Sequence, residues 1–370
     1  MRILLDYRPA LRERTGVGEY AHELAAALAR RLQPPDALTL FSSSWKDRLA
    51  PARVAGAAQV DVRVPVGVLN AAWHRLGWPP VELFAGAIDI AHSMHPLLMP
   101  ARRARQVITV HDLDFLDHPE RTRGEIRRDY AALAPAHAAR ADLVVTVSQF
   151  TAGEVQRRLG VPREKIAVCS PGAPAWAARP DRRPAGPILF MGTLEPRKNV
   201  GVLLAAYAGL LRGRTNDAEA RRPVPELWLA GGATPAAADW LRAIEQPPLA
   251  GHVKQLGYVE SQRRYDLYTQ ASMLVLPSHL EGFGIPALEA MTAGVPVIVS
   301  NRGALPEVTG GAAQVIEPDD VEGLARAMER YLDDAEGAAT SAARNGVLRA
   351  RQYSWDASAA GLLARYRELA

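Results

Sequence analysis

The chain has 370 residues, 48% of them hydrophobic, and a formal net charge of +4 from 44 Lys and Arg against 40 Asp and Glu. This length predicts two globular domains, and no run approaches the about 20 uninterrupted apolar residues of a membrane-spanning helix. The single cysteine, Cys169, excludes an intrachain disulfide framework and a cysteine-based metal site, and the apolar run at Met1–Asp6 is too short for a signal peptide, so we expect a cytoplasmic protein.

The N-terminal half predicts an α/β domain. A strand at 2–6 is followed by a loop, Thr15-Gly-Val-Gly-Glu-Tyr20, and by a helix whose apolar stripe is Tyr20, Leu24, Leu28 and Leu32. The further elements we predict are strands at 37–41, 87–91, 106–110, 142–147 and 165–168, and helices at 130–139 and 149–159 with Ser148 as an N-cap. Strands that alternate with helices in this way are typical of a doubly wound parallel sheet.

Two patterns in this half are candidate site features. Gly16-x-Gly18-x-x-Ala21 superficially matches a dinucleotide fingerprint, but it lies nine residues beyond the first strand, and the next strand is not followed by the expected acid. We interpret it as a tight turn or as a glycine loop aimed at a cleft. His111 and Asp112 directly follow the strand 106–110, where ligands of open α/β sheets bind, although each residue taken alone would more often have a structural role.

A change of composition marks the domain boundary. Five prolines and two glycines fall between residues 171 and 187, and no apolar periodicity is present there. We therefore expect an N-terminal domain at 1–175, a linker at 176–186 and a C-terminal domain at 187–354.

The second half repeats the alternation of strand and helix. We predict strands at 187–191, 227–230, 253–256, 271–277 and 295–300, helices at 200–211 and around Tyr265–Tyr268, and a final helix that begins after Ser354. Two doubly wound domains that face each other across a cleft are the expected architecture.

The most informative stretch is Glu281-Gly-Phe-Gly-Ile-Pro-Ala-Leu-Glu289, which follows the apolar strand 271–277. Pro286 is suited to the first turn of a helix, and Gly282 and Gly284 let the backbone approach a ligand closely. The amide groups at a helix start can face an anion. A strand, loop and helix with a glycine pair between two acids therefore predict a site for a phosphorylated, polyhydroxylated ligand.

Four segments, in this order, resemble glycosyltransferase family 4. They are Thr15–Tyr20, Val110-His-Asp-Leu113, Gly192-Thr-Leu-Glu-Pro-Arg-Lys-Asn199 and Glu281–Glu289. The chain is most similar to bacterial mannosyl- and rhamnosyltransferases of this family, which are retaining enzymes of the GT-B type. The resemblance runs over about residues 1–370 and implies two Rossmann-like domains facing across a cleft, with a C-terminal helix at about 355–370 packing back on the N-terminal domain.

The resemblance also implies a role for each matching residue. Arg197 and Lys198 would bind the donor diphosphate, and Lys198 is one of only four lysines in the chain. Glu289 would accept hydrogen bonds from the two ribose hydroxyls, and Glu281 would lie against the donor sugar. The remaining implied donor-site residues are His111 facing the sugar, the glycine loop Gly16 and Gly18, the backbone of Gly282, Phe283, Gly284 and Ile285, and Val259 near the nucleobase.

Such a site needs no metal and no cofactor beyond the nucleotide sugar, because Arg197, Lys198 and two helix starts would stabilise the departing diphosphate. A covalent glycosyl-enzyme would require a carboxylate nucleophile, whereas the family is usually described as transferring on one face of the sugar through an oxocarbenium-like species. Asp112-x-Asp114 leaves a metal-dependent transferase as an alternative, although two acids make a poor site. A phosphorylase with lysine-bound pyridoxal phosphate is disfavoured, because the other lysines lie in no matching context.

The resemblance implies a hexose donor, with a GDP-sugar favoured, and a saccharide or lipid-linked acceptor in surface polysaccharide synthesis. Residues 1–175 carry 23 Lys and Arg against 18 Asp and Glu, a net charge of +5, and include Arg102, Arg103 and Arg105. This balance suits a peripheral contact with the inner face of the membrane, or simply a solvated surface. No recognised nucleic-acid module is present. The alternatives are a UDP-sugar enzyme with a soluble small-molecule acceptor, or a catalytically silent nucleotide-sugar-binding scaffold.

Overall fold

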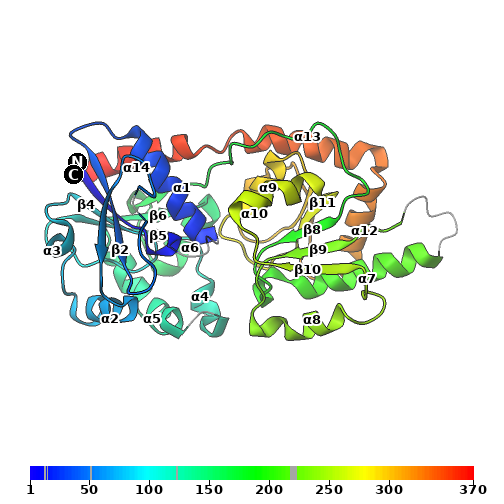
Figure 1. Cartoon of the computed structure of the whole chain (residues 1–370), viewed down its shortest axis with the longest axis horizontal. Coiled ribbons are helices and arrows are strands. Elements are labelled where there is room, and N and C mark those ends of the chain that lie inside the picture. Colours follow the sequence, from blue (N-terminus) through cyan, green and yellow to red (C-terminus); the bar gives the residue numbers. More distant parts are fainter. Residues whose placement is uncertain (12–13, 15, 51, 122–123, 217–222) are drawn as a thin grey trace. The chain divides into compact units, whose positions relative to one another are not determined.

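The computed structural model describes residues 1–370 except 12–13, 15, 51, 122–123 and 217–222 (Figure 1). Thr15 of the expected glycine loop therefore lies outside the described residues. The chain divides into two compact units, Met1–Gly172 with Ser354–Ala370, and Ala173–Tyr353. Residues 176–186 contain no helix or strand and belong to the second unit.

The described part of the first unit contains a parallel sheet of seven strands in the order β3-β2-β1-β4-β5-β6-β7. The strands are β1 (Arg2–Asp6), β2 (Ala37–Ser43), β3 (Ala58–Val62), β4 (Ile90–Ser93), β5 (Arg105–Val110), β6 (Leu143–Thr146) and β7 (Ile166–Val168). The chain proceeds outward from β1 to β3 and then returns to the other side of β1, so the strand order reverses between β1 and β4.

The helices of the first unit are α1 (Gly16–Arg31), α2 (Val66–Leu76), α3 (Glu82–Ala85), α4 (Asp114–Asp117), α5 (Gly124–Arg140), α6 (Gln149–Leu159) and α14 (Trp355–Leu369), with short 3-10 turns at Arg8–Ala10, Pro119–Arg121 and Arg163–Lys165. The C-terminal helix α14 packs beside α1, as expected (Figure 1). Its Tyr366 hydroxyl contacts His92 of β4 in the buried interior. Ser148 caps α6 by accepting a hydrogen bond from the Thr151 amide.

The expected glycine loop is wrong in one respect, because α1 already begins at Gly16. Gly16 and Gly18 therefore lie in the first helical turn. A Cβ atom on Gly18 would lie 2.6 Å from the Pro9 carbonyl oxygen, so this glycine allows a close approach between α1 and the turn after β1. The sequence pattern shows that glycine is present at position 18, but it does not show the contact with Pro9 that requires it.

The described part of the second unit contains a parallel sheet of six strands in the order β10-β9-β8-β11-β12-β13. The strands are β8 (Ile188–Met191), β9 (Leu227–Ala230), β10 (Val253–Gly257), β11 (Met273–Leu276), β12 (Val297–Ser300) and β13 (Gln314–Ile316). Here the strand order reverses between β8 and β11.

The helices of the second unit are α7 (Val200–Asn216), α8 (Ala238–Ala243), α9 (Ser261–Gln270), α10 (Ile285–Thr292), α11 (Leu305–Thr309), α12 (Val321–Leu332) and α13 (Ala338–Ala350), with 3-10 turns η4 (Pro196–Lys198), Pro235–Ala237 and Ala335–Gly337. None of the helices in the described part of the chain is both long enough and apolar enough to span a bilayer.

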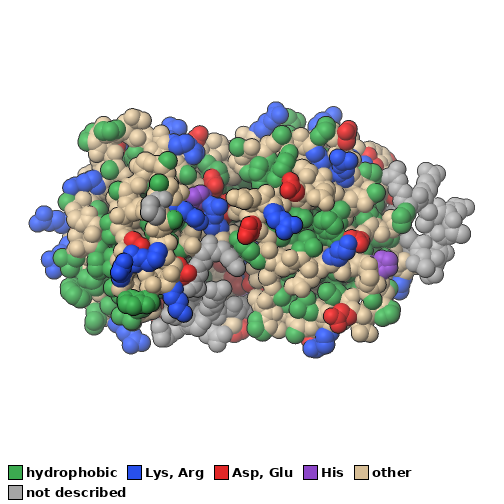
Figure 2. Space-filling model, viewed as in Figure 1, with side chains coloured by type: hydrophobic (Ala, Val, Ile, Leu, Met, Phe, Trp, Pro, Cys, Tyr) green, Lys and Arg blue, Asp and Glu red, His purple; other side chains and the backbone are tan. Residues whose placement is uncertain are grey.

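Five central strands, β4, β6, β8, β11 and β12, are buried along their whole length, which is why they appear in the sequence as largely apolar runs. The edge strands β3 and β13 are largely half-buried or exposed, and sequence patterning missed both. Figure 2 shows that on the visible face of each unit Lys and Arg side chains are interspersed with acidic and hydrophobic ones.

Candidate active site

Three predicted residues of the second unit, Arg197, Lys198 and Glu281, meet at the point where its strand order reverses. β8 leads into η4, which carries Arg197 and Lys198, and β11 leads into the loop that carries Glu281. β8 and β11 pair in parallel, so the two connections emerge together at the carboxyl edge of the sheet. The His279 amide donates to the Arg197 carbonyl oxygen at 2.8 Å, which joins the two connections directly. Ligands of open α/β sheets bind at this kind of position.

Lys198 and Glu281 form a buried ion pair at this edge. The Lys198 ammonium donates to Glu281 Oε1 at 2.5 Å, and the Ser278 hydroxyl donates to the same oxygen at 2.9 Å. Lys198 is 7% exposed and Glu281 is 5% exposed. A charged pair this well covered must be held by further polar groups, since the loss of hydration is costly. Both charges therefore lie at the reversal point already oriented by the protein.

Arg197 adds a second cation beside the pair. Its Nη1 lies 3.8 Å from Glu281 Oε2 and donates to the Leu280 carbonyl oxygen at 3.3 Å, while its Nε donates to Glu195 at 2.7 Å. Unlike Lys198, Arg197 is only partly buried. Glu281 thus faces two cations, one of which, Arg197, is also paired with Glu195.

Burial and charge act in opposite directions on this pair. Burial by itself would raise the pKa of Glu281, but the charges of Lys198 and Arg197 and the hydrogen bonds from Lys198 and Ser278 lower this pKa below its usual value. Burial lowers the pKa of Lys198, and the Glu281 carboxylate opposes that shift. We therefore treat Glu281 as a carboxylate and Lys198 as an ammonium at neutral pH.

The backbone around Glu281 is clamped by the segment after β12. The Ala304 amide donates to the Glu281 carbonyl oxygen at 2.9 Å. Gly303 has a φ of +62°, and a Cβ atom there would lie 2.4 Å from that same oxygen. Gly284, with a φ of +95°, caps α10, and Pro286 follows in the first turn as predicted. Close backbone packing thus restrains the loop Glu281–Ile285.

Glu289 lies one turn inside α10 and is also buried. Arg264 Nη1 lies 2.8 Å from its Oε1, and the Tyr268 hydroxyl donates to its Oε2 at 2.9 Å. Both partners come from α9, which follows β10. Val259, the residue expected near the nucleobase, lies in the connection between β10 and α9. The second acid of the motif is therefore held by a different element from the first.

Asn199 fixes the turn that presents Lys198. It ends η4 with a φ of +56°, a conformation in which Asn is enriched among non-glycine residues. Its side-chain amide donates to the carbonyl oxygens of Pro277, at 3.2 Å, and Pro318, at 2.6 Å. These bonds tie η4 to the end of β11 and to the segment after β13.

We expect Asn199→Ala to lower the free energy of unfolding by about 2–4 kcal/mol, because a left-handed alanine costs about 1–2 kcal/mol and each unpaired buried carbonyl adds about 1 kcal/mol or more. Asn199→Gly, which tolerates the positive φ, should lose only the two hydrogen bonds and be less destabilised. Urea midpoints of the three proteins measure this. Equal midpoints for Asn199→Ala and Asn199→Gly would show that the backbone conformation is not what Asn199 supplies.

The other predicted residues belong to the first unit. His111 directly follows β5; its Nε2 donates to the Met94 carbonyl oxygen at 3.3 Å, and its ring meets the edge of Tyr20 with centroids 5.1 Å apart. Burial lowers the pKa of His111 to about 4, so the ring is neutral at physiological pH. A neutral imidazole can donate or accept a hydrogen bond but cannot supply a fixed positive charge.

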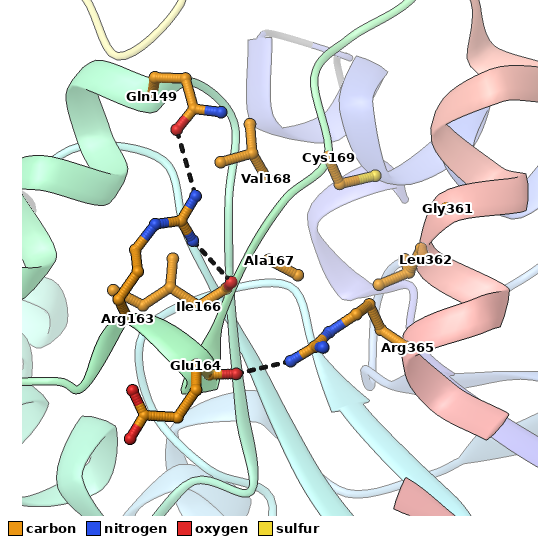
Figure 3. A pocket seen from close by; sticks show the side chains of 10 residues that line it. All are labelled: Gln149, Arg163, Glu164, Ile166, Ala167, Val168, Cys169, Gly361, Leu362 and Arg365. Atoms are coloured by element: carbon orange, nitrogen blue, oxygen red, sulfur yellow. Dashed lines mark hydrogen bonds between the residues drawn. The ribbon is translucent and has the colours of Figure 1, made fainter. Parts of the chain in front are cut away.

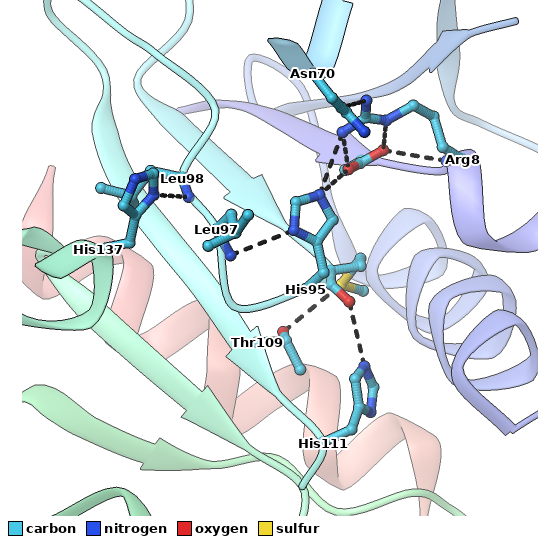
Figure 4. A network of polar contacts seen from close by, with 10 residues as sticks. Arg8, Asn70, His95, Leu97, Leu98, Thr109, His111 and His137 are labelled. Carbon is cyan, nitrogen blue, oxygen red and sulfur yellow. Dashed lines mark hydrogen bonds and ion pairs between the residues drawn. The ribbon is translucent and has the colours of Figure 1, made fainter. Parts of the chain in front are cut away.

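A buried polar cluster that the sequence interpretation missed lies where the first sheet reverses its order, between β1 and β4. Asp6 accepts two hydrogen bonds from the Arg8 guanidinium, and its Oδ2 lies 3.3 Å from His95 Nε2. Arg8 also donates to Asn70 at 2.9 Å and lies over the Trp73 ring. Figure 4 shows Arg8, Asn70 and His95 grouped together, with His111 farther away. His111 contacts the carbonyl oxygen of Met94, the residue before His95. This position makes the cluster a candidate part of a ligand site in the first unit.

Two other features of the first unit contain none of the predicted site residues that bind the donor. A pocket of about 420 Å³ lies between β7 and α14, lined by Gln149, Arg163, Glu164, Ile166–Cys169, Gly361, Leu362 and Arg365, none of them a predicted site residue (Figure 3). Arg163 and Arg365 donate there to the carbonyl oxygens of Ile166 and Glu164. Within the described ranges no three His, Cys, Asp or Glu side chains are grouped to hold a metal ion, and Asp112 accepts a hydrogen bond from the Asp114 amide.

Some of the side chains that contact the site residues could have been predicted from the sequence, and others could not. Ser278 lies three residues before Glu281, so a local contact was foreseeable. Arg264 and Tyr268 are four residues apart on a helix, which places them on one face, but nothing in the sequence pairs that face with Glu289. Asp6 and Arg8 flank the end of the first strand, yet their contact with His95 depends on the strand order.

Comparison with known proteins supports the family resemblance of the sequence motifs. Residues 14–175 match the family model described as Glycosyltransferase Family 4, and residues 184–346 match the model described as Glycosyl transferases group 1. The chain is 30% identical, over 96% of its length and 97% of the relative's, to the O-antigen chain mannosyltransferase B of Escherichia coli.

Solved structures share the fold. Sucrose-phosphate synthase from Thermosynechococcus elongatus superposes with a TM-score of 0.74 at 21% identity, covering 100% of this chain and 99% of that chain. The Anabaena protein HepE, in complex with UDP and glucose, superposes with a TM-score of 0.72 at 17% identity over the whole of both chains. With two doubly wound units and matches to both family models along nearly its whole length, this chain belongs to glycosyltransferase family 4 and has the GT-B fold.

Proposed function

We propose that this glycosyltransferase moves a hexose, mannose or a rhamnose-like sugar, from a nucleoside diphosphate sugar to a saccharide or lipid-linked saccharide in the synthesis of a surface polysaccharide. The observation that carries the proposal is the buried Lys198–Glu281 pair with Arg197 beside it at the strand-order reversal. A relative named O-antigen chain mannosyltransferase B supports the sugar and the pathway. A GDP-sugar is the donor we favour.

In this proposal Arg197 and Lys198 bind the diphosphate of the donor, and Glu281 orients the sugar beside it. The bond between the anomeric carbon and the phosphate oxygen breaks, and its electron pair stays on the diphosphate. The acceptor oxygen bonds to the anomeric carbon on the same face, and its proton passes to the departing phosphate oxygen. The largest contribution of the protein is electrostatic, because fixed cations face the position where negative charge grows.

The remaining predicted residues complete the proposal. Glu289 binds the ribose hydroxyls, the backbone of Gly282–Ile285 binds the sugar and phosphate oxygens, and Val259 lies near the nucleobase. His111 contacts the donor sugar as a neutral hydrogen-bonding group, and Gly16 and Gly18, in the first turn of α1, lie near the diphosphate. Retention of configuration can be read from the anomeric signals of the product by NMR; an inverted product would reject the same-face mechanism.

The donor and the metal independence can be tested together. We expect GDP and GDP-mannose to raise the melting temperature more than UDP, ADP and their sugars, because a ligand that binds only the folded state stabilises it. Release of GDP in the presence of acceptor should be unchanged by EDTA. A larger stabilisation by UDP would favour the alternative, a UDP-sugar enzyme with a soluble acceptor, and the UDP complex of the structurally similar HepE gives that alternative weight. Loss of turnover in EDTA, restored by Mg²⁺ or Mn²⁺, would reject metal independence.

We further propose that the first unit contacts an anionic membrane surface through α2, α3 and the turn before β5. Leu76 is 75% exposed, Trp78 56% and Leu83 60%, within eight consecutive residues. Glu82 of α3 accepts hydrogen bonds from the amides of Arg102 and Arg103. These bonds hold the turn that carries the two arginines beside α3, which includes Leu83. A groove of about 760 Å³ there is lined by Arg2, Glu82, Gly86–Asp89, Arg102, Arg103, Arg105 and Ala370. Exposed apolar side chains beside arginines suit a lipid interface.

Vesicle co-sedimentation tests this contact. Binding to vesicles that contain phosphatidylglycerol should exceed binding to pure phosphatidylcholine vesicles and should weaken with salt. The double substitution Arg102→Ser/Arg103→Ser should reduce the binding constant about 30-fold, at about 1 kcal/mol per basic residue near the surface. Arg326→Ser, an exposed arginine of α12 in the second unit, is the matched control. Equal binding of wild type and the double variant would reject this surface.

A further inference from the structure

The carboxylate of Glu289 is held on both oxygens by a helix outside the acidic motif. Arg264 and Tyr268 project from α9, one contacting Oε1 at 2.8 Å and the other donating to Oε2 at 2.9 Å. Because the two residues are four positions apart, they lie on one face of α9 and approach the carboxylate together. Two donors, one on each oxygen, fix the plane of the carboxylate group.

Burial and aromatic packing around α9 hold Arg264, Tyr268 and Glu289 in this arrangement. Tyr268 is completely buried, and the Trp176 ring packs at 5.9 Å from its ring and at 5.4 Å from that of Tyr265. The Tyr265 hydroxyl donates to the Ala177 carbonyl oxygen at 2.9 Å, away from Glu289. Burial and the Glu289 carboxylate hold the pKa of Tyr268 well above its usual value, so its hydroxyl stays protonated and remains a donor.

We propose that Arg264 and Tyr268 are positioning residues that orient the Glu289 carboxylate for the vicinal 2′ and 3′ hydroxyls of the donor ribose, and that they thereby set the discrimination between ribonucleotides and 2′-deoxyribonucleotides. This inference rests on the proposed function, in which Glu289 binds the ribose. A carboxylate binds two neighbouring hydroxyls only when its two oxygens face them, so its plane must be fixed before the ligand arrives. A fixed polar site rejects an analogue that lacks one hydroxyl, because the carboxylate then loses one of the hydrogen bonds that it would accept from the ribose.

The decisive variant is Tyr268→Phe, which removes one hydroxyl and keeps the buried ring. Its matched control is Tyr265→Phe, which removes a hydroxyl from the same helix that bonds elsewhere. The probes are GDP and 2′-deoxy-GDP, with UDP and 2′-deoxy-UDP as the second pair, and the readout is the ratio of dissociation constants within a pair. A structural role alone would shift both members of a pair equally and leave this ratio unchanged.

We expect the wild type to bind the ribonucleotide roughly 10- to 100-fold more tightly than its 2′-deoxy form, as for a hydrogen bond to a charged group. Tyr268→Phe should reduce this ratio several-fold, mainly by weakening the ribonucleotide, whereas Tyr265→Phe should keep it. Arg264→Lys, which keeps a cation but not the guanidinium geometry, should raise the KM for the donor with a smaller change in kcat. A Tyr268→Phe ratio equal to that of the wild type would overturn the proposal.

Glu289→Gln separates this inference from the function on which it rests. If Glu289→Gln lowers the ratio and Tyr268→Phe does not, Glu289 binds the ribose but α9 does not position it, and only the inference fails. If Glu289→Gln leaves the ratio and the affinity unchanged, Glu289 does not bind the ribose, and that part of the proposed function fails with the inference. If Tyr268→Phe and Glu289→Gln each lower the ratio, and Tyr268→Phe/Glu289→Gln lowers it no further, the result supports both the inference and the ribose contact of Glu289.

Discussion

Lys198→Met is expected to abolish measurable transfer and to weaken binding of the nucleoside diphosphate. The substitution keeps the apolar stem of the side chain and removes the buried ammonium that we assign to the diphosphate. Loss of a single fixed donor to a developing negative charge typically lowers kcat by about 100- to 1,000-fold. Loss of ground-state binding to the diphosphate would add to the effect on kcat/KM.

The structure adds a complication that the sequence does not reveal. Lys198→Met leaves Glu281 buried with Arg197 at 3.8 Å as its remaining nearby cation. Breaking a buried ion pair by removing one partner costs about 3–5 kcal/mol, so the variant should also be less stable. Lys198→Met/Glu281→Gln removes both charges and should recover much of that stability without recovering transfer.

Isothermal titration with GDP and UDP, together with urea midpoints, separates the two effects. The double variant Lys198→Met/Glu281→Gln is the control for stability. If the unpaired Glu281 carboxylate is what destabilises Lys198→Met, the double variant should regain much of the wild-type stability. Unchanged diphosphate affinity in a folded Lys198→Met protein would show that Lys198 does not bind the diphosphate.

Glu281→Gln is expected to lower kcat by about 100-fold or more while changing nucleotide affinity little. The amide has nearly the shape of the carboxylate and can still accept a hydrogen bond from Ser278 and from Lys198 through its oxygen. What it lacks is the negative charge, which we expect both to orient the sugar and to stabilise the positive charge that develops on it. A glutamine also lets the Lys198 ammonium interact more strongly with the diphosphate, so the affinity for GDP or UDP should not fall.

Steady-state kinetics with varied donor and a titration of the free nucleotide measure this prediction. Ser278→Ala is the matched control, since it removes a hydrogen bond to the same oxygen and keeps the charge. It should lower kcat much less than Glu281→Gln. A loss confined to KM in Glu281→Gln would place Glu281 away from the reacting sugar.

Much of the fold follows from local patterns. Strands buried on both faces produce apolar runs such as 273–276, and these runs located the central strands of both sheets. The edge strand β3 has no such run, because most of its residues are only half-buried, and it was missed. The loop expected at Gly16 was wrong because α1 already begins there, and the reason for Gly18, its contact with Pro9, depends on how α1 packs and not on a local pattern.

The sequence alone determined the class of fold, the family and the chemical types at the candidate site, because apolar periodicity and the ordered motifs are local properties of the chain. Only the tertiary structure decided which side chains are partners. Lys198 and Glu281 are separated by 83 residues, and Tyr268 and Glu289 by 21. The first pair meets because β8 and β11 become neighbours where the strand order reverses, and the second because α9 lies against α10. Strand order and helix packing are properties of the whole domain, so no local pattern specifies these contacts.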